Sequence, residues 1–315
     1  MEAEEAAAGS VKFDTPGVTI FCCVAFLLAW LLALPLWFSR SGLADPLAVV
    51  FLAAMMFCPT IAVLAVLLFR PQSIKPVGSV TGLVVHHWKR LFLYCLLTWL
   101  TVLGLVLAAL FVGAVFGFYH FDLKSFSGFV DLIGRSPKGA ELLSRVPIGF
   151  LVLLQFLSLT IAPFVNAPFA FGEEWGWRGF LLPKLLPLGQ WPALIFSGAM
   201  WGFWHAPVVL LGFDYPQHRE LGVILMVAFC VIIGILIGWL RLASGSIWPC
   251  VVAHGTLNGC AGVPYMLADA KSSFDTAQVT ILGWTGWILP LLLIALLILT
   301  RRLPVKLSAP GTTVS

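Results

Sequence analysis

Three ionisable residues stand close together in a stretch that is otherwise strongly apolar. The stretch reads AFGEEWGWRGFLLPKL over residues 170–185 and contains Glu173, Glu174 and Arg178. On a helix, residues four apart share a face, whereas neighbours point about 100° apart. The spacing therefore predicts an ion pair between Glu174 and Arg178 and leaves Glu173 free for chemistry. The simpler alternative is that all three are interfacial charges that stay in water.

Two further motifs place polar side chains inside apolar segments. His205 lies in SGAMWGFWHAP, with Trp201 one helical turn before it, where it can form a wall of the same pocket. His254 and Asn258 lie in CVVAHGTLNG, four residues apart, so that both can donate hydrogen bonds to one point. Two such donors can stabilise an oxyanion. The alternative for each motif is a structural hydrogen bond between membrane helices.

One shared, water-filled cavity explains these separate polar groups together. Glu173 would act as a general base on a water molecule, and His205 would position that water and pass a proton to the leaving amine. His254 and Asn258 would hold the oxyanion of the amide under attack. The reaction class that this arrangement predicts is hydrolysis of a peptide bond by activated water.

The elements that position these residues are predicted to be membrane helices. Of the 315 residues, 10% are charged and 60% are hydrophobic, and the mean hydropathy is +1.01. A soluble domain carries about a quarter charged residues, and a bilayer-spanning helix needs roughly 20 mostly apolar residues. We therefore predict an all-α, polytopic integral membrane helical bundle of about eight transmembrane helices, at approximately 17–38, 46–69, 91–118, 147–171, 191–213, 220–240, 246–266 and 279–300.

The chain is expected to form one transmembrane domain with two tails. These parts are an N-terminal cytoplasmic tail at 1–16, a single transmembrane domain at 17–302 with its catalytic core at about 160–265, and a disordered C-terminal tail at 303–315. The long hydrophilic stretch 119–146 is expected to be an extramembrane loop with a short interfacial helix near 128–134.

Lys and Arg residues in the loops predict the orientation. With the N-terminus inside, eleven of the 18 Lys and Arg residues fall on the inner side and seven on the outer side. Because cytoplasmic loops carry an excess of these residues, both termini are predicted to be cytoplasmic. The membrane is expected to be a bacterial plasma membrane, or the endoplasmic reticulum if the source is eukaryotic. The net charge of +4 fits this bias and indicates no nucleic-acid partner.

The three motifs resemble those of one known family. EEWGWR at residues 173–178 resembles the E-E-x-x-x-R motif of the CPBP membrane proteases, which include the type II CAAX prenyl endopeptidases and the Abi group. His205 matches the histidine of the family's F-x-x-x-H motif, although Trp201 replaces its usual Phe. His254 and Asn258 match the H-x-x-x-N motif. The motifs occur in the family's order within about residues 160–265.

The resemblance implies an intramembrane endopeptidase. Its substrate would be a peptide or protein, prenylated at its C-terminus in CAAX processing, or another membrane-associated peptide. The catalytic residues that it implies are Glu173, His205, His254 and Asn258, with Glu174 and Arg178 as structural support and Trp201 as a pocket wall.

The resemblance leaves the use of metal open, because the family is described both as metalloproteases and as enzymes with a glutamate-activated water. The chain has no H-E-x-x-H motif, and Asn is a poor third ligand for catalytic zinc. A zinc site would have to use Glu173, His205 and His254.

Two other functional classes remain open. Buried Glu and His also form the proton relays of ion- or proton-coupled transporters, but the sequence has no visible internal repeat of the kind common in such proteins. A non-catalytic scaffold of the same fold is the other class, and the complete set of motifs argues against it.

Overall fold

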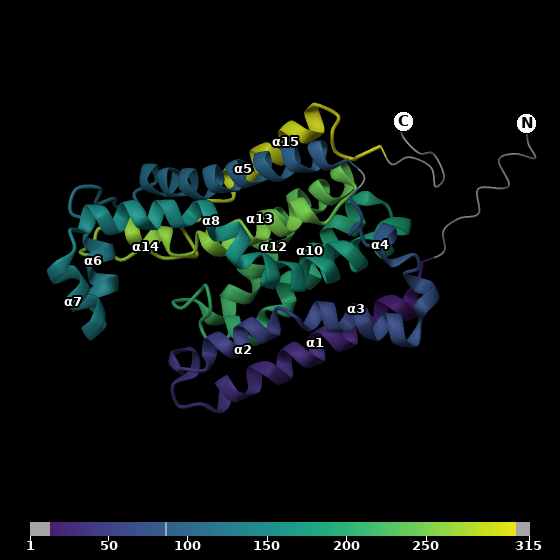
Figure 1. Ribbon diagram of the computed structural model, residues 1–315, viewed down its shortest axis with the longest axis horizontal. Helices are drawn as coiled ribbons and strands as arrows, with labels where there is room; N and C mark the ends of the chain where they lie inside the picture. Colours follow the sequence, from purple (N-terminus) through teal and green to yellow (C-terminus); the bar gives the residue numbers. More distant parts are fainter. Residues whose placement is uncertain (1–12, 86, 307–315) are drawn as a thin grey trace, which may run out of the picture.

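The computed structural model describes residues 13–85 and 87–306, and helices form nearly all of the regular structure (Figure 1). The only pairing of extended backbone within this described part is an isolated bridge between Phe121 and Ala268. The longer helices are α1 (Thr15–Phe38), α2 (Ala48–Met55), α3 (Cys58–Phe69), α5 (Trp88–Val115), α8 (Ile148–Glu174), α10 (Gln190–Trp204), α12 (Arg219–Ser244), α13 (Trp248–Gly259) and α15 (Ile288–Leu299). The shorter ones are η2 (Gly42–Ala44), η3 (Pro71–Ser73), α4 (Val77–Val80), α6 (Ser127–Gly134), α7 (Pro137–Arg145), η4 (Trp175–Leu181), α9 (Leu182–Leu185), η5 (Leu186–Leu188), α11 (Ala206–Val209) and α14 (Val263–Leu267).

Within the described residues, five helical segments are long and apolar enough to cross a bilayer. They are Thr15–Phe38, Ala48–Phe69, Trp88–Val115, Ile148–Leu188 and Arg219–Ser244. The outward faces of these segments carry large exposed apolar side chains, such as Phe38, Val115 and Phe164. These are the features of a multi-pass integral membrane protein.

The remaining predicted spans correspond to shorter helices. α10 has 15 residues, and α13 and α15 have 12 each. α15 begins only at Ile288 because residues 279–287, predicted as part of a span, form turns that include Thr280 with a positive φ of 70°. The apolar pattern therefore locates eight hydrophobic segments, of which five are long enough to be candidate spans in the described chain.

Proline interrupts the second predicted span. The stretch 46–69 is divided into α2 and α3 by a turn at Met56–Phe57. Pro59 is the second residue of α3 and has no N–H to donate to the carbonyl four residues earlier. Hydropathy does not detect this break, because the residues on both sides are equally apolar.

The hydrophilic stretch contains one more helix than expected. α6 forms at the predicted position, and α7 follows it after a short turn. Ser136 caps α7 by accepting a hydrogen bond from the backbone N–H of Gly139 at 3.0 Å, and Pro137 occupies the first helical position. α6 packs against both α7 and α14.

Small residues allow close packing of the two central helix pairs, α10 with α12 and α8 with α13. A Cβ atom added to Gly198 or Gly202 would lie within 2.5–2.8 Å of the α12 backbone. A Cβ on Gly259 would lie 2.3 Å from Ala162 of α8. Such close approach of backbones is the usual basis of helix association in membranes.

The start of α1 and the end of α15 lie at the same end of the molecule, opposite α6 and α7 (Figure 1). At this end Asp14 forms ion pairs with Arg70 at 3.7 Å and Lys184 at 3.3 Å. Gln190 makes two hydrogen bonds to the backbone of Val305. Residues 303–306 of the predicted C-terminal tail are therefore held against the bundle, whereas its residues 307–315, and residues 1–12 of the N-terminal tail, lie outside the described residues.

Candidate active site

A cavity of about 520 Å³ lies between the central helices and extends toward the connections that follow α1, α11 and α14. The connection after α1 lies at the end of the molecule opposite Asp14, because α1 runs between the two ends (Figure 1). α11 lies beside the end of α1, where Trp37 Nε1 donates to the carbonyl of Pro207 at 2.8 Å, and α14 packs against α6 at the same end. Most of the lining side chains are apolar, including Met55, Val106 and Phe229. A mainly apolar cavity of this size with a few polar groups is typical of a site for a small molecule or a peptide segment.

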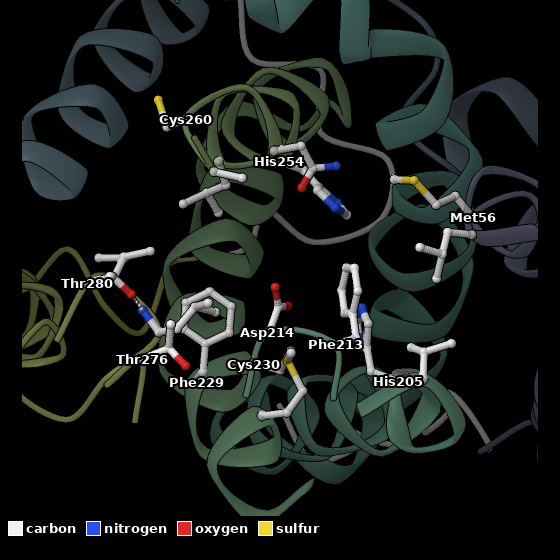
Figure 2. A pocket seen from close by; sticks show the side chains of 18 of the residues that line it. Met56, His205, Phe213, Asp214, Phe229, Cys230, His254, Cys260, Thr276 and Thr280 are labelled. Atoms are coloured by element: carbon white, nitrogen blue, oxygen red, sulfur yellow. Dashed lines mark hydrogen bonds between the residues drawn. The ribbon is translucent and has the colours of Figure 1, made fainter. Parts of the chain in front are cut away.

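The cavity brings together the polar residues that the motifs singled out. Glu173 from α8, His205 from the end of α10, and His254 and Asn258 from α13 all line it, as does Trp201. Figure 2 shows His205 and His254 on opposite sides of this space. Three separate helices therefore supply one polar constellation.

The backbone changes its helical pitch where the acidic motif ends. α8 ends at Glu174, and η4 continues it as a π-helical segment with Arg178 at its centre. π-helical turns are rare and occur frequently at functional sites. The spacing of the motif predicts a regular α-helix here, so this change of pitch was not predicted.

Glu174 and Arg178 form the expected ion pair, and it is fully buried. Arg178 Nη1 donates to Glu174 Oε1 at 2.8 Å, and the side chains are 1% and 0% exposed. The guanidinium also lies over the ring of Trp201, 4.2 Å from its centroid. A Cβ on Gly234 of α12 would lie 3.3 Å from Arg178 Nη2, so the glycine leaves room for the guanidinium. The pair thus lies inside the bundle and not in interfacial water.

Glu174 also fixes the orientation of His254. The Nδ1 atom of His254 lies 2.8 Å from Glu174 Oε1, the same oxygen that accepts from Arg178. A carboxylate accepts hydrogen bonds, so the His254 Nδ1 carries the proton in this contact. The other ring nitrogen, Nε2, then faces Glu173, with 3.9 Å between Nε2 and Oε1. The sequence contains no spacing that predicts this link between α8 and α13.

Trp201 holds one carboxylate oxygen of Glu173, and the other oxygen has no hydrogen-bond partner among the described residues. Trp201 Nε1 donates to Glu173 Oε2 at 2.7 Å, and the Glu173 residue is 2% exposed. The 3.9 Å between Glu173 Oε1 and His254 Nε2 is too long for a direct hydrogen bond. Both atoms can therefore bind a third group, such as a water molecule. A Phe at position 201 would lack the N–H that holds this carboxylate.

His205 presents one free nitrogen to the cavity. Its Nδ1 lies 2.8 Å from the carbonyl oxygen of Trp201. Because a carbonyl only accepts hydrogen bonds, Nδ1 is the protonated nitrogen, and Nε2 is an acceptor in the neutral ring. The imidazole packs edge-on against the rings of Trp201 and Trp204. Asn258 lies in the last turn of α13, and its side-chain amide makes no hydrogen bond to any described residue.

Glu173, His205 and His254 are the three possible zinc ligands of the cavity. Within residues 13–85 and 87–306, no group of three or more His, Cys, Asp and Glu side chains gathers closely enough to hold a metal ion. Glu173, His205 and His254 share the cavity but do not converge as a three-ligand set. These residues therefore do not fit a three-ligand zinc site.

One polar residue of the cavity was missed by the sequence analysis. Asp214 lies in the connection between α11 and α12 and points its carboxylate into the cavity (Figure 2). It belongs to no motif, and it lies at the edge of an apolar segment, where an acidic residue is ordinary. Only the fold shows that this loop closes over the site.

The buried ion pair generates a stability prediction. Removing one partner of a buried pair leaves an uncompensated charge and costs about 3–5 kcal/mol. We therefore expect Arg178→Ala to lower the apparent unfolding temperature in detergent strongly. Arg135→Ala is the matched control, because Arg135 forms an equally short i, i+4 pair with Asp131 at 2.8 Å that is exposed, and exposed pairs contribute about 0.2–1 kcal/mol. Equal losses of stability in the two variants would contradict this account of Arg178.

Comparison with known proteins agrees with the motif analysis. Residues 150–260 match the family model described as type II CAAX prenyl endopeptidase, Rce1-like. A search of curated proteins found no match. The matched segment runs from the start of α8 to the end of α13 and contains all the residues of the EEWGWR motif, together with His205, His254 and Asn258. Over these residues the chain is therefore similar to the Rce1-like type II CAAX prenyl endopeptidases, which are a family of peptidases.

Proposed function

We propose that this protein hydrolyses a peptide bond of a membrane-associated peptide with a water molecule activated by Glu173. The observation that carries the proposal is the position of the Glu173 carboxylate. One of its oxygens is fixed by Trp201, and the other faces His254 across a gap of 3.9 Å within the cavity. A buried base with one free oxygen beside a substrate-sized space is suited to general-base catalysis.

The first step is attack by water. Glu173 Oε1 removes a proton from the water molecule while the water oxygen attacks the carbonyl carbon of the scissile amide. His205 helps to orient the water, because its Nε2 can accept a hydrogen bond from the second O–H, which keeps its hydrogen. As the C–N bond breaks, the leaving amine needs the proton that Glu173 has taken, and His205 lies in the same cavity to pass it on.

The oxyanion that forms is stabilised from α13. In its doubly protonated form, His254 donates one N–H to Glu174 and directs the other into the cavity. Asn258, one turn later, supplies a second donor through its side-chain amide. Fixed donors in a site with little water stabilise a developing negative charge more strongly than bulk water does. Glu174 and Arg178 act indirectly, since they fix the ring that donates.

Loss of the base is the main test of this proposal. In detergent, we expect the wild type to cleave a farnesylated CAAX peptide or one of a panel of membrane peptides, and Glu173→Gln to lower kcat/KM by about 10²–10⁴-fold. Glu220→Gln is the control, because Glu220 is exposed in the first turn of α12 and does not line the cavity.

The same assay separates the alternatives. Wild-type rates in Glu173→Gln would rule out this residue as the base. A chelator is expected to leave the rate unchanged, and loss of activity that added zinc restores would assign a role to metal. Uptake of a solute by reconstituted vesicles without any peptide cleavage would support a transporter instead.

Trp201 provides a second prediction about the same carboxylate. Trp201→Phe keeps an aromatic ring and removes the bond to Glu173. A hydrogen bond to a charged group contributes about 1.5–3 kcal/mol, so we expect kcat to fall about tenfold or more with little change in KM. Trp204→Phe is the control, since Trp204 Nε1 donates to the backbone of Ala25, away from the base. An equal fall in kcat in both variants would contradict the role of Trp201.

Orientation in the membrane determines which peptides can reach the cavity. The cavity extends toward the end of the molecule opposite the start of α1 and the end of α15. With both termini cytoplasmic, it extends toward the non-cytoplasmic side. That orientation favours an exported or membrane-inserted peptide over a prenylated protein that stays in the cytoplasm.

Reporter fusions test the orientation. We expect a C-terminal green fluorescent protein fusion to fluoresce and a C-terminal alkaline phosphatase fusion to be inactive in bacterial cells. A fusion placed between α6 and α7 should give the opposite pair of results. The reverse pattern at both sites would place the open end of the cavity in the cytoplasm and favour prenylated substrates.

A further inference from the structure

Asp214 has no role in the hydrolysis described above, although its carboxylate faces the same cavity. The residue has a φ of 62°, in the left-handed region that non-glycine residues seldom adopt. Asp tolerates this region when its short side chain bonds to the local backbone. The Asp214 carboxylate makes no hydrogen bond and no ion pair with any residue in 13–85 or 87–306. Local capping therefore does not explain its presence.

The loop that carries Asp214 is anchored on both sides. The buried Tyr215 donates its hydroxyl to the backbone of Leu282 at 2.9 Å. His218 Nε2 lies 2.7 Å from Asp275 Oδ2, and the backbone N–H of Phe213 donates to Val208 at 3.1 Å. These contacts hold Asp214 in its strained conformation and direct its side chain inward. Strain that the surroundings enforce is a feature of ligand-binding sites.

The cavity has an unbalanced charge. Its lining contains two carboxylates, Glu173 and Asp214, and among the described residues that line it there is no Lys or Arg. The protonated form of His254 is already matched by Glu173 and Glu174, which it faces, and so it leaves Asp214 without a counter-charge. Glu173 has a neutral hydrogen-bond donor in Trp201 and faces His254, whereas Asp214 has neither. A carboxylate surrounded by apolar groups is unfavourable without a cationic partner. Burial raises the pKa of Asp214 to about 7, and a cation beside it would favour the ionised form.

We propose that Asp214 binds a cationic side chain of the peptide substrate, Lys or Arg, and so gives the enzyme a preference for basic residues near the scissile bond. This assignment rests on the proposed peptidase function. The ammonium or guanidinium of the substrate supplies the charge that the cavity lacks. The apolar walls contributed by Met226 and Phe229 would pack against the aliphatic part of the same side chain.

The test is a comparison of peptides that differ at one residue. In a peptide that the wild type cleaves, each position near the scissile bond is replaced in turn by Lys, by norleucine and by Glu. At one of these positions we expect the ratio of kcat/KM for Lys to that for norleucine to be about tenfold or more. In Asp214→Asn, which also tolerates the left-handed conformation, the ratio should fall to about one. Asp214→Lys should reverse the preference, so that Glu is cleaved faster than Lys.

Glu220→Gln is the control at the same end of the molecule, and it should keep the wild-type ratio. Size-exclusion profiles and unfolding temperatures establish that each variant is folded. A wild type without any preference for Lys, or an Asp214→Asn variant that retains the full preference, would overturn the assignment. If the Asp214→Asn variant retains the preference for Lys, the side chain at position 214 only shapes the loop.

A binding measurement separates failure of this inference from failure of the proposed function. Fluorescent Lys and norleucine peptides are titrated into Glu173→Gln protein and into the Glu173→Gln/Asp214→Asn double variant, with anisotropy as the readout. Tighter binding of the Lys peptide that disappears in the double variant supports the cation site even if the wild type cleaves no peptide. Equal binding of both peptides by Glu173→Gln protein overturns the inference, whatever the wild type cleaves.

Discussion

The carboxylate of Glu174 accepts bonds from both Arg178 and His254 within an apolar bundle, and the arrangement of the site depends on this shared oxygen. Glu174 Oε2 and Arg178 Nη2 are buried without a hydrogen-bond partner among the described residues, so the compensation is concentrated on Oε1. Removing such charges from water is costly, and close, well-directed partners are required to offset that cost. That requirement fixes α13 relative to α8 to within the tolerance of a hydrogen bond. Since His254 is on α13 and Glu173 is next to Glu174, the distance between the base and the imidazole is fixed by the same contact.

The shared oxygen also explains why two glutamates are adjacent. Neighbouring side chains on a helix point about 100° apart, so one can face the interior of the bundle while the other faces the cavity. Glu174 is entirely buried and accepts bonds from Arg178 and His254, whereas Glu173 touches the space where substrate would lie. Both roles are required near one point of the helix. Two adjacent glutamates fill both roles from a single helix. Arg178, which balances the charge of Glu174, lies four positions further along the chain.

Much of the site could be predicted from the sequence, because ionisable residues are conspicuous in an apolar chain. Glu173, His205 and His254 are conspicuous in this way, Asn258 is identified by its spacing four residues after His254, and all four line one cavity. The bond between Glu174 and His254 could not be predicted, since it joins residues that are 80 positions apart. Asp214 could not be predicted either, because an acid in a polar connection has no distinguishing pattern.

For the fold, hydropathy predicted the positions of the apolar segments but not the breaks and irregular turns within their helices. Hydropathy reports the free energy of transferring a segment into lipid, so it located the apolar segments and the all-α class. It does not report whether the helix within a segment is continuous. The interruption before Pro59, the late start of α15 and the π-helical turn around Arg178 depend on backbone hydrogen bonding and on packing against neighbours. These irregularities were therefore absent from the prediction, although one of them lies within the site.

The short helices offer a reason for the location of the cavity. α10 and α13 have 15 and 12 residues, which corresponds to roughly 22 and 18 Å at 1.5 Å per residue, less than the hydrocarbon thickness of about 30 Å. Each has to end inside the bundle, where its last carbonyl groups need partners other than lipid. Backbone N–H groups of the residues that follow supply most of these partners, and His205 Nδ1 donates to the carbonyl of Trp201. His205 directly follows α10, and Asn258 lies in the last turn of α13. The early ends of these two short helices thus place His205 and Asn258 beside the same space.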